Sequence, residues 1–600
     1  MTCPCTIQKT GRPFVVRCCK PERKTSPAPD QRYIAGRSTG VTADAMSDNL
    51  AAALALYASG NLADAYAALK SALAKDPAPG PKALLVMAQC CAKLDHFTEA
   101  AGFYRQAATI LPDQALTLTT LADKMERSGI EKASALEIQR LETSRRAIRS
   151  GPFDVQSWRT YRTALRQTLN IDEMRMSDQA VRDRLNRQEE TYYSLDSQTA
   201  HLSWCDDETL NSRWNNGLPA PGPASRDWRK PAGETLKLAY LLADGPSDDP
   251  LRRLTLSLAA RHDRAAFDIL LICQEPPGPE ELDAEMTALS LKDLCEDAAL
   301  AALRAADIDI LIDPLGHGDG GRPDLLRHRI APLHLAMAGH PGPRTGLICD
   351  YTLANTAVLP KDDLRLHGRA ICHLPEIFLV SSPVQQPPSL SRKQFDLPED
   401  GVVFAAFHPT EQISPRTADL WVDILRQAEN SLLWISCGNY ACKNFSAWMN
   451  RQGIAQNKLV FRNPAEPLER VGWMTLADIA LDCFPYNDGF STLDALQAGL
   501  PVPTFSGGNF ASRVTASLLQ ACGLEKLIAR DADAYVTLCI DLARDKSARE
   551  ALKQTIRAQG PRSPLFDVTG FIRHLETAYH TMAARAATGL EPQDFSVPVL

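Results

Sequence analysis

Short runs of apolar residues, each bounded by turn-forming residues, recur along the chain after residue 235. Each run is continuous rather than alternating, and helical patterns separate one run from the next. This combination is typical of strands in a parallel sheet covered by helices on both faces, because both sides of every strand are then buried. The runs form one series at 236–244, 267–273, 308–313 and 378–380, and a second at 402–407, 432–436, 458–461, 479–483 and 502–505.

Two series of this kind predict two doubly wound α/β halves that face each other across a cleft. We assign residues 235–390 to the first half and residues 391–585 to the second. Residues 586–600 are expected to form a flexible tail. Ligands of doubly wound sheets bind beyond the carboxyl ends of the strands, so the cleft is the expected ligand site.

The composition excludes several classes of protein. The chain has 600 residues, of which 44% are apolar and 23% charged, so it is neither disordered throughout nor fibrous. A net charge of −7 provides no overall basic excess for binding nucleic acid or an anionic membrane. No apolar stretch approaches the roughly 20 residues that span a bilayer. We therefore expect several domains, no nucleic-acid partner and no membrane span.

The cysteines and the first residues indicate the cellular setting. Sixteen cysteines are spread over the chain, many of them in apolar segments, which is typical of small buried residues with reduced thiols. Residues 1–45 are basic and lack the apolar core of a signal peptide. We expect residues 1–45 to be a disordered extension and the protein to be cytoplasmic.

A helical pattern begins at Met46 and repeats. The first unit has Gly60 at its turn, and the second has the turn Asp95–Phe97; alanines follow each turn where the two helices would cross. Helix backbones approach closely only where side chains are small, and this spacing matches the roughly 34-residue tetratricopeptide pattern. A third, weaker unit is expected from Ala115 through Gly129, and Trp158 is a candidate start of a fourth.

These units predict a tetratricopeptide-like helical domain over residues 46–200, with a generic helical bundle as the alternative. Stacked repeats form a groove that binds an extended or helical protein segment. The stretch NGLPAPGPASRDWRKPAGE at 216–234 is too rich in proline and glycine for helix or strand. We assign residues 201–234 to a linker between the repeats and the α/β halves.

The most informative stretch is ADIALDCFPYNDGFSTLDALQAGLPVPT at 477–504, where a strand, a turn and a helix start near Ser491 follow one another. Free amides at a helix start bind anions, and the hydroxyls of Ser491 and Thr492 would add donors. Asp494 is placed to accept hydrogen bonds from a ribose. The alternative is a capped helix start in which Asp494 only complements the helix dipole.

Motifs across the α/β halves resemble the O-GlcNAc transferase/SPINDLY group of glycosyltransferases. They are DIDILIDPLGHGDGGR (307–322), APLHLAMAGHPG (331–342), DY (350–351), FPYNDGFSTLDALQAGLPV (484–502) and ASRVTASLL (511–519). The resemblance implies a GT-B fold after the repeats and a nucleotide-sugar donor as substrate, with no metal or other cofactor. It also implies donor-binding roles for Asn487, Thr492 and Asp494.

The chain departs from the group at several positions of the expected site. Asp248 stands where the group has a histidine after the first strand, and Gln412 stands where it has a phosphate-binding lysine. Pro467, Arg470 and Trp473 occupy positions that are basic in the group. Loss of a cation that stabilises a departing diphosphate raises the free energy of the transition state by several kcal/mol. We therefore expect either a different donor, such as a CMP-activated nonulosonic acid, or a loss of activity.

The resemblance narrows further to bacterial flagellin-modification glycosyltransferases, which combine a short repeat module with such a catalytic half. It implies sugar transfer to Ser or Thr hydroxyls of a protein, flagellin being the expected acceptor. The alternative is a catalytically inactive adaptor or chaperone that binds its client through the same groove.

Direct displacement at the anomeric carbon needs a base near the attacking hydroxyl and stabilisation of the departing phosphate. His317 and Asp248 are the candidate bases, against the alternatives of a structural hydrogen bonder and a solvated turn acid. Arg322 is a candidate to orient the donor, or pairs with Asp319. Arg470 is a candidate phosphate ligand, or pairs with Glu466 or Glu469. Gln412 and Ser491 complete the expected donor site.

Overall fold

The structure is a computed structural model. It describes residues 48–74, 79–214, 228, 230–231, 233–245, 249–278, 281–283, 286–318, 320–337, 339–360, 366–382, 389–462 and 467–600. These residues form two compact units, Met1–Glu126 and Arg127–Leu600, which we describe separately. The expected extension at 1–45 lies outside the described residues.

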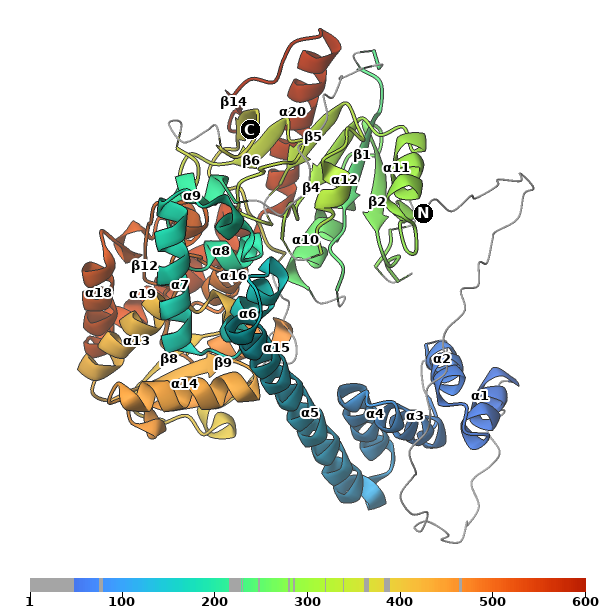
Figure 1. Cartoon of the computed structure of the whole chain (residues 1–600), viewed down its shortest axis with the longest axis vertical. Coiled ribbons are helices and arrows are strands. Elements are labelled where there is room, and N and C mark those ends of the chain that lie inside the picture. Colours follow the sequence, from blue (N-terminus) through green and yellow to red (C-terminus); the bar gives the residue numbers. More distant parts are fainter. Residues whose placement is uncertain are drawn as a thin grey trace. The chain divides into compact units, whose positions relative to one another are not determined.

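The first unit consists of helical hairpins, as predicted (Figure 1). Helices α1 (Asp48–Ala58) and α2 (Leu62–Leu73) form one pair, and α3 (Pro81–Lys93) and α4 (Phe97–Ile110) form the next. Gly60 turns the chain between α1 and α2 with a left-handed backbone, φ 83°. Ala65 and Ala100 are wholly buried at the helix contacts, where a larger side chain would hold the helices apart.

The expected third unit is wrong, because α5 (Ala115–Ser150) is one continuous helix of 36 residues. Gly129 lies inside it and makes no turn. A glycine within a helix costs only about 1 kcal/mol, which the rest of so long a helix offsets. The first turns of α5 complete the core of the first unit, where Leu118 and Ala122 pack with residues of α3 and α4.

The second unit begins with more helices. Trp158 lies in α6 (Val155–Gln167), which packs against α7 (Ile171–Asn186). The short helices α8 (Gln198–Leu202) and α9 (Glu208–Ser212) follow. The prediction of a linker that begins at residue 201 is therefore wrong, because the end of α8 and all of α9 lie within residues 201–214. Its first part folds because Asp207 caps α9, accepting a hydrogen bond from Leu210 N at 3.1 Å. Residues 215–227 lie outside the described residues.

The first α/β half contains an eight-stranded sheet, and every strand pair whose register is known is parallel, as predicted. The order is β14-β7-β6-β5-β4-β1-β2-β3. The strands are β1 (Leu236–Leu241), β2 (Phe267–Cys273), β3 (Thr287–Ser290), β4 (Ile310–Asp313), β5 (Leu333–Ala336), β6 (Tyr351–Ala354), β7 (Ala370–His373) and β14 (Phe595–Ser596). Helices α10 (Pro250–Ala259), α11 (Glu296–Ala305) and α12 (Pro323–Leu326) connect the strands.

The second half contains a parallel four-stranded sheet of order β10-β9-β8-β11 and a separate parallel pair, β12 and β13. The strands are β8 (Val402–Ala406), β9 (Ser431–Ser436), β10 (Leu459–Arg462), β11 (Ile479–Ala480), β12 (Thr504–Phe505) and β13 (Ile528–Ala529). The helices are α13 (Pro415–Gln427), α14 (Asn439–Arg451), α15 (Pro467–Met474), α16 (Gly489–Gln497), α17 (Val514–Ala521), α18 (Ala532–Arg544) and α19 (Lys546–Gln559).

Two boundary predictions are wrong. The apolar run at 378–380 is buried but forms no strand, because the chain there passes from one half to the other. The end of the chain returns to the first half. Helix α20 (Val568–Ala587) lies against that sheet (Figure 1), and the Tyr579 hydroxyl is 3.0 Å from that of Tyr240. Phe595–Ser596 then pair with β7, so residues 586–600 do not form a free tail.

Candidate functional site

A cavity of about 280 Å³ lies between the two halves, where the sequence places the ligand cleft. The first half contributes Asp249, His340 and His367 to its lining, and the second half contributes Gln412, Arg470 and Asn487. A neighbouring cavity of about 340 Å³ shares Pro250, Arg470 and Phe490 with it. The two cavities together provide one site reached from both halves.

The loop at 482–488 is held by a buried carboxylate. Asp482 accepts hydrogen bonds from Asn487 Nδ2 at 3.0 Å and Thr504 Oγ1 at 2.7 Å. Burial raises the pKa of Asp482 to about 6. Asn487 also donates to Cys483 O at 2.9 Å, so its side-chain nitrogen maintains the loop while the residue lines the cavity.

The helix start expected near Ser491 is the start of α16 at Gly489, where Asp488 accepts a hydrogen bond from Phe490 N at 3.2 Å. Ser491 Oγ donates to Phe407 O at 3.0 Å and also to Asp488. Thr492 Oγ1 lies 3.0 Å from Thr515 Oγ1. Both hydroxyls are buried and bonded within the protein, and neither residue lines the two cavities.

Asp494 forms an ion pair with Arg470. Arg470 Nε donates to Asp494 Oδ2 at 2.7 Å, and Nη2 approaches the same oxygen. Burial raises the pKa of Asp494, although the Arg470 charge acts in the opposite direction. Both residues line the cavity of about 340 Å³, together with Arg253 and Arg261. The predicted phosphate ligand thus lies beside the predicted ribose ligand.

Gln412 lies in a short 3₁₀ turn, Thr410–Gln412, after β8. It lines the cavity of about 280 Å³, and its buried Oε1 has no hydrogen-bond partner among the described residues. Trp473 is part of the core, where its ring stacks on that of Trp434 with centroids 5.7 Å apart. Pro467 is the first residue of α15.

His317 and Arg322 are not among the residues that line the two cavities. His317 Nε2 donates to Thr345 O at 2.8 Å, and its ring meets the edge of Trp214 at 4.8 Å between centroids. Burial lowers the pKa of His317 to about 4, so the ring is neutral at physiological pH. Arg322 pairs with Asp324 at 2.7 Å. Asp248 lies outside the described residues.

Sequence reasoning missed His340 and His367, two histidines that line the cavity of about 280 Å³. His340 stands inside the motif APLHLAMAGHPG, between residues that match the O-GlcNAc transferase group, so its position was the available signal. His367 has no motif around it. Its Nε2 pairs with Glu208 of α9, a contact between residues far apart in the sequence.

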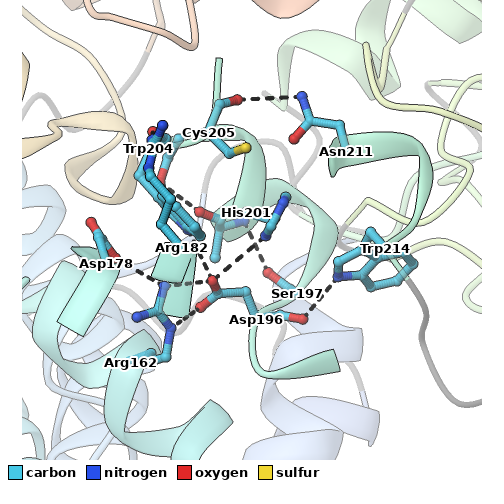
Figure 2. Close-up of polar contacts among 12 residues, drawn as sticks. Arg162, Asp178, Arg182, Asp196, Ser197, His201, Trp204, Cys205, Asn211 and Trp214 are labelled. Atoms are coloured by element: carbon cyan, nitrogen blue, oxygen red, sulfur yellow. Dashed lines mark hydrogen bonds and ion pairs between the residues drawn. The ribbon is translucent and has the colours of Figure 1, made fainter. Parts of the chain in front are cut away.

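The helical segment α8–α9 contacts both halves. Gln198 donates to Pro343 O at 2.8 Å in the first half, and Cys205 O accepts from Asn509 Nδ2 at 2.9 Å in the second. A buried network fixes this segment (Figure 2). Asp196 accepts from Arg162 Nε at 2.7 Å and from Trp204 Nε1 at 2.9 Å. The first part of the expected linker, residues 201–214, is therefore folded against both halves.

Comparison with known proteins agrees with this architecture. Residues 383–575 match the model of glycosyl transferase family 41, and residues 56–122 match that of the tetratricopeptide repeat. The second α/β half is thus similar to the glycosyl transferase family 41 model. The fold is similar to that of an O-GlcNAc transferase mutant from Thermobaculum terrenum, with a TM-score of 0.62 and 20% identity over 90% of this chain and 98% of that chain.

Two curated relatives extend the comparison. The chain is 27% identical over 401 residues to the probable UDP-N-acetylglucosamine--peptide N-acetylglucosaminyltransferase SEC of Arabidopsis thaliana, covering 64% of this chain and 40% of that protein. It is 30% identical over 307 residues to the probable enzyme SPINDLY of Oryza sativa subsp. japonica, with coverages of 50% and 32%. The chain thus spans less than half the length of these relatives.

The described residues hold neither a metal-binding cluster nor a membrane-spanning helix. They include no group of three or more His, Cys, Asp or Glu side chains arranged to hold a metal ion. Across the same residues, no helix is both long enough and apolar enough to cross a bilayer.

Proposed function

We propose that this protein transfers a sugar from a nucleotide-sugar donor to a Ser or Thr hydroxyl of a protein acceptor. The cavity between the halves would bind the donor, and the tetratricopeptide unit would bind the acceptor protein. The observation that carries the proposal is the cavity itself, which both halves line and which includes the Asn487 loop. The two curated relatives are described as peptide N-acetylglucosaminyltransferases.

In the proposed reaction the acceptor oxygen forms a bond to the anomeric carbon of the donor. The bond from that carbon to the phosphate oxygen breaks, and its electron pair leaves on the phosphate. The hydroxyl proton passes to a base in the cleft. No redox partner is required, and the donor is consumed as a substrate.

We propose further that the donor is a CMP-activated nonulosonic acid, with flagellin as the acceptor. Gln412 is neutral where the related group has lysine, which suits a leaving group with one phosphate rather than two. Arg253, Arg261 and Arg470 line the neighbouring cavity and would attract the carboxylate of such a sugar. The cytoplasm, where the free thiols of the described cysteines are stable, is the proposed location.

One observation favours the inactive adaptor as a second candidate. Ser491, Thr492 and Asp494 all have partners within the protein, so a donor would have to displace the Arg470–Asp494 ion pair or bind beside it. An adaptor would retain the repeats and the closed helix start, and would transfer no sugar.

Incubation of the protein with flagellin and either CMP- or UDP-activated sugars, followed by intact-protein mass measurement, separates these possibilities. We expect a mass gain with a CMP-nonulosonic acid. A gain only with UDP-GlcNAc would overturn the donor, and no gain with any donor would favour the adaptor. Asp494→Ala should weaken nucleotide binding in a calorimetric titration and leave flagellin binding unchanged.

A further inference from the structure

Gln198, in the first turn of α8, contacts the loop that carries His340. The residue is 1% exposed, although it belongs to the helical segment outside the α/β halves. Its Nε2 donates to Pro343 O at 2.8 Å, and its Oε1 faces His340 Nε2 within hydrogen-bond distance. One amide thus binds both the ring and the backbone of the same loop.

This arrangement determines where the proton of His340 resides. The carbonyl of Pro343 can only accept a hydrogen bond, so the amide nitrogen of Gln198 must face it. The amide oxygen then faces His340, and an oxygen at that position requires a proton on Nε2. Burial, reinforced by the nearby charge of Arg344, holds the pKa of His340 well below its ordinary value. The neutral ring therefore has an unprotonated Nδ1.

Two glycines leave room around this ring. A Cβ on Gly342 would lie 2.5 Å from His340 Nε2 and 2.6 Å from Gln198 Oε1, so a side chain there is incompatible with the hydrogen bond. A Cβ on Gly318 would lie 3.1 Å from His340 Nδ1. The Nδ1 edge thus faces a residue without a side chain, and His340 lines the cavity between the halves.

The charged and titratable groups around His340 come from three elements. Arg344, on the same loop, is paired with Asp313 at 2.8 Å at the end of β4. His317 lies after β4, and His367 is paired with Glu208 of α9. Arg344 lowers the pKa of His340 although it is paired with Asp313, and a carboxylate at position 198 would act on the ring in the opposite direction.

We propose that Gln198 is a positioning residue that holds His340 as the Nε2–H tautomer, with Nδ1 as the proton acceptor for the attacking hydroxyl. This rests on the proposed sugar transfer. As the hydroxyl oxygen bonds to the anomeric carbon, its proton passes to Nδ1, and the phosphate leaves with the electron pair of the broken bond. The resulting imidazolium keeps its Nε2–H hydrogen bond to Gln198.

The tautomer can be measured without any transfer assay. Long-range ¹H–¹⁵N spectra of the full chain labelled with ¹⁵N-histidine, compared with the His340→Asn variant, identify the His340 ring. We expect a neutral Nε2–H ring from pH 6 to 8. Gln198→Glu has the same shape and places a carboxylate against the ring, so it should raise the pKa of His340 by at least one unit. Gln156→Glu, an exposed amide on α6, should leave it unchanged.

An Nδ1–H ring in the wild type, or an unchanged pKa in Gln198→Glu, would overturn the inference whatever the enzyme transfers. In the mass-based transfer assay, Gln198→Glu should shift the acidic limb of the kcat profile upward and leave the donor Kd unchanged. Gln198→Leu should lower kcat at least tenfold at every pH. If Gln198→Glu leaves the pH profile of kcat unshifted and Gln198→Leu has a normal kcat, the Gln198–His340 pair has no role in the proton transfer. No transfer by the wild type, with the expected spectra, would refute the proposed function and the proton-acceptor step but leave the tautomer assignment intact.

Discussion

Asp196→Ala tests whether the buried network beneath α8–α9 fixes that segment. Arg162 is 0% exposed and the Asp196 side chain 2% exposed, and two short contacts join them, Nε to Oδ1 and Nη2 to Oδ2, both at 2.7 Å. Although burial opposes ionisation, Arg162 holds the pKa of Asp196 below its ordinary value. Removing the carboxylate leaves a buried guanidinium with one fewer partner and leaves the Trp204 indole N–H unbonded.

Removing one partner of a buried ion pair costs about 3–5 kcal/mol. The lower end applies here, because Arg162 Nη2 keeps a second contact to Asp178 at 2.9 Å. About 3 kcal/mol corresponds to a roughly 150-fold change in an equilibrium constant. Hydrogen exchange of the full chain reports local unfolding, so the slowest amides of α6–α9 should lose roughly 150-fold of their protection.

Asp419→Ala is the matched control. Asp419 accepts from Arg175 at 2.8 and 2.9 Å with the same bidentate geometry, but the two side chains are 46% and 48% exposed. Exposed pairs contribute about 0–1 kcal/mol, so protection should fall by no more than about fivefold. Equal losses in the two variants would refute the claim that burial makes the Asp196 network decisive for this segment.

Three further predictions concern the buried histidines, Gln412 and Gly342. Burial lowers the pKa values of His201 and His317 to about 4, so between about pH 6.5 and 4 the unfolded chain binds protons that the folded chain does not. The melting temperature should therefore fall as the pH is lowered through this range, although the raised pKa of Asp482 acts in the opposite direction. His201→Gln should make the melting temperature depend less on pH. Gln412→Lys should strengthen UDP binding relative to CMP binding by about tenfold in calorimetric titrations, since a cation then faces the second phosphate; an unchanged ratio would remove Gln412 from the phosphate site. Gly342→Ala should destabilise the protein by about 1–3 kcal/mol in thermal melts, because its Cβ would collide with the Gln198–His340 hydrogen bond; an unchanged melt would contradict that geometry.

The sequence predicted the features that depend on local pattern. Continuous apolar runs located β1, β2, β4 and β8 through β12, and the alanine spacing located α1 through α4, but no run predicted β13. The predictions failed where long-range contacts decide. Phe378–Val380 is as apolar as a strand but connects the halves, and Phe595–Ser596 becomes a strand only because an edge of the first sheet is available beside β7.

In the site, too, local pattern predicted the position of residues, whereas long-range contacts determined their partners. Motif spacing located the Asn487 loop, Arg470 and Asp494 in one place, but the ion pair between the last two depends on how α15 and α16 pack. Ser491 and Thr492 were expected to face a ligand and are instead bonded inside the half. The roles of His340 and His367 depend on Gln198 and Glu208, which lie more than a hundred residues away, Gln198 at the end of the predicted repeat domain and Glu208 in the predicted linker.

The return of α20 to the first sheet has a mechanical consequence. The backbone crosses between the halves twice, once near residues 378–401 and once between the end of α19 at Gln559 and the start of α20 at Val568. Two covalent crossings restrict the relative movement of the halves more than a single connection would. Truncation before Val568 would remove one crossing and uncover Tyr240 and Phe267, which contact α20. Residues 568–600 thus attach the second half to the first at a second place, and a deletion there would remove that attachment.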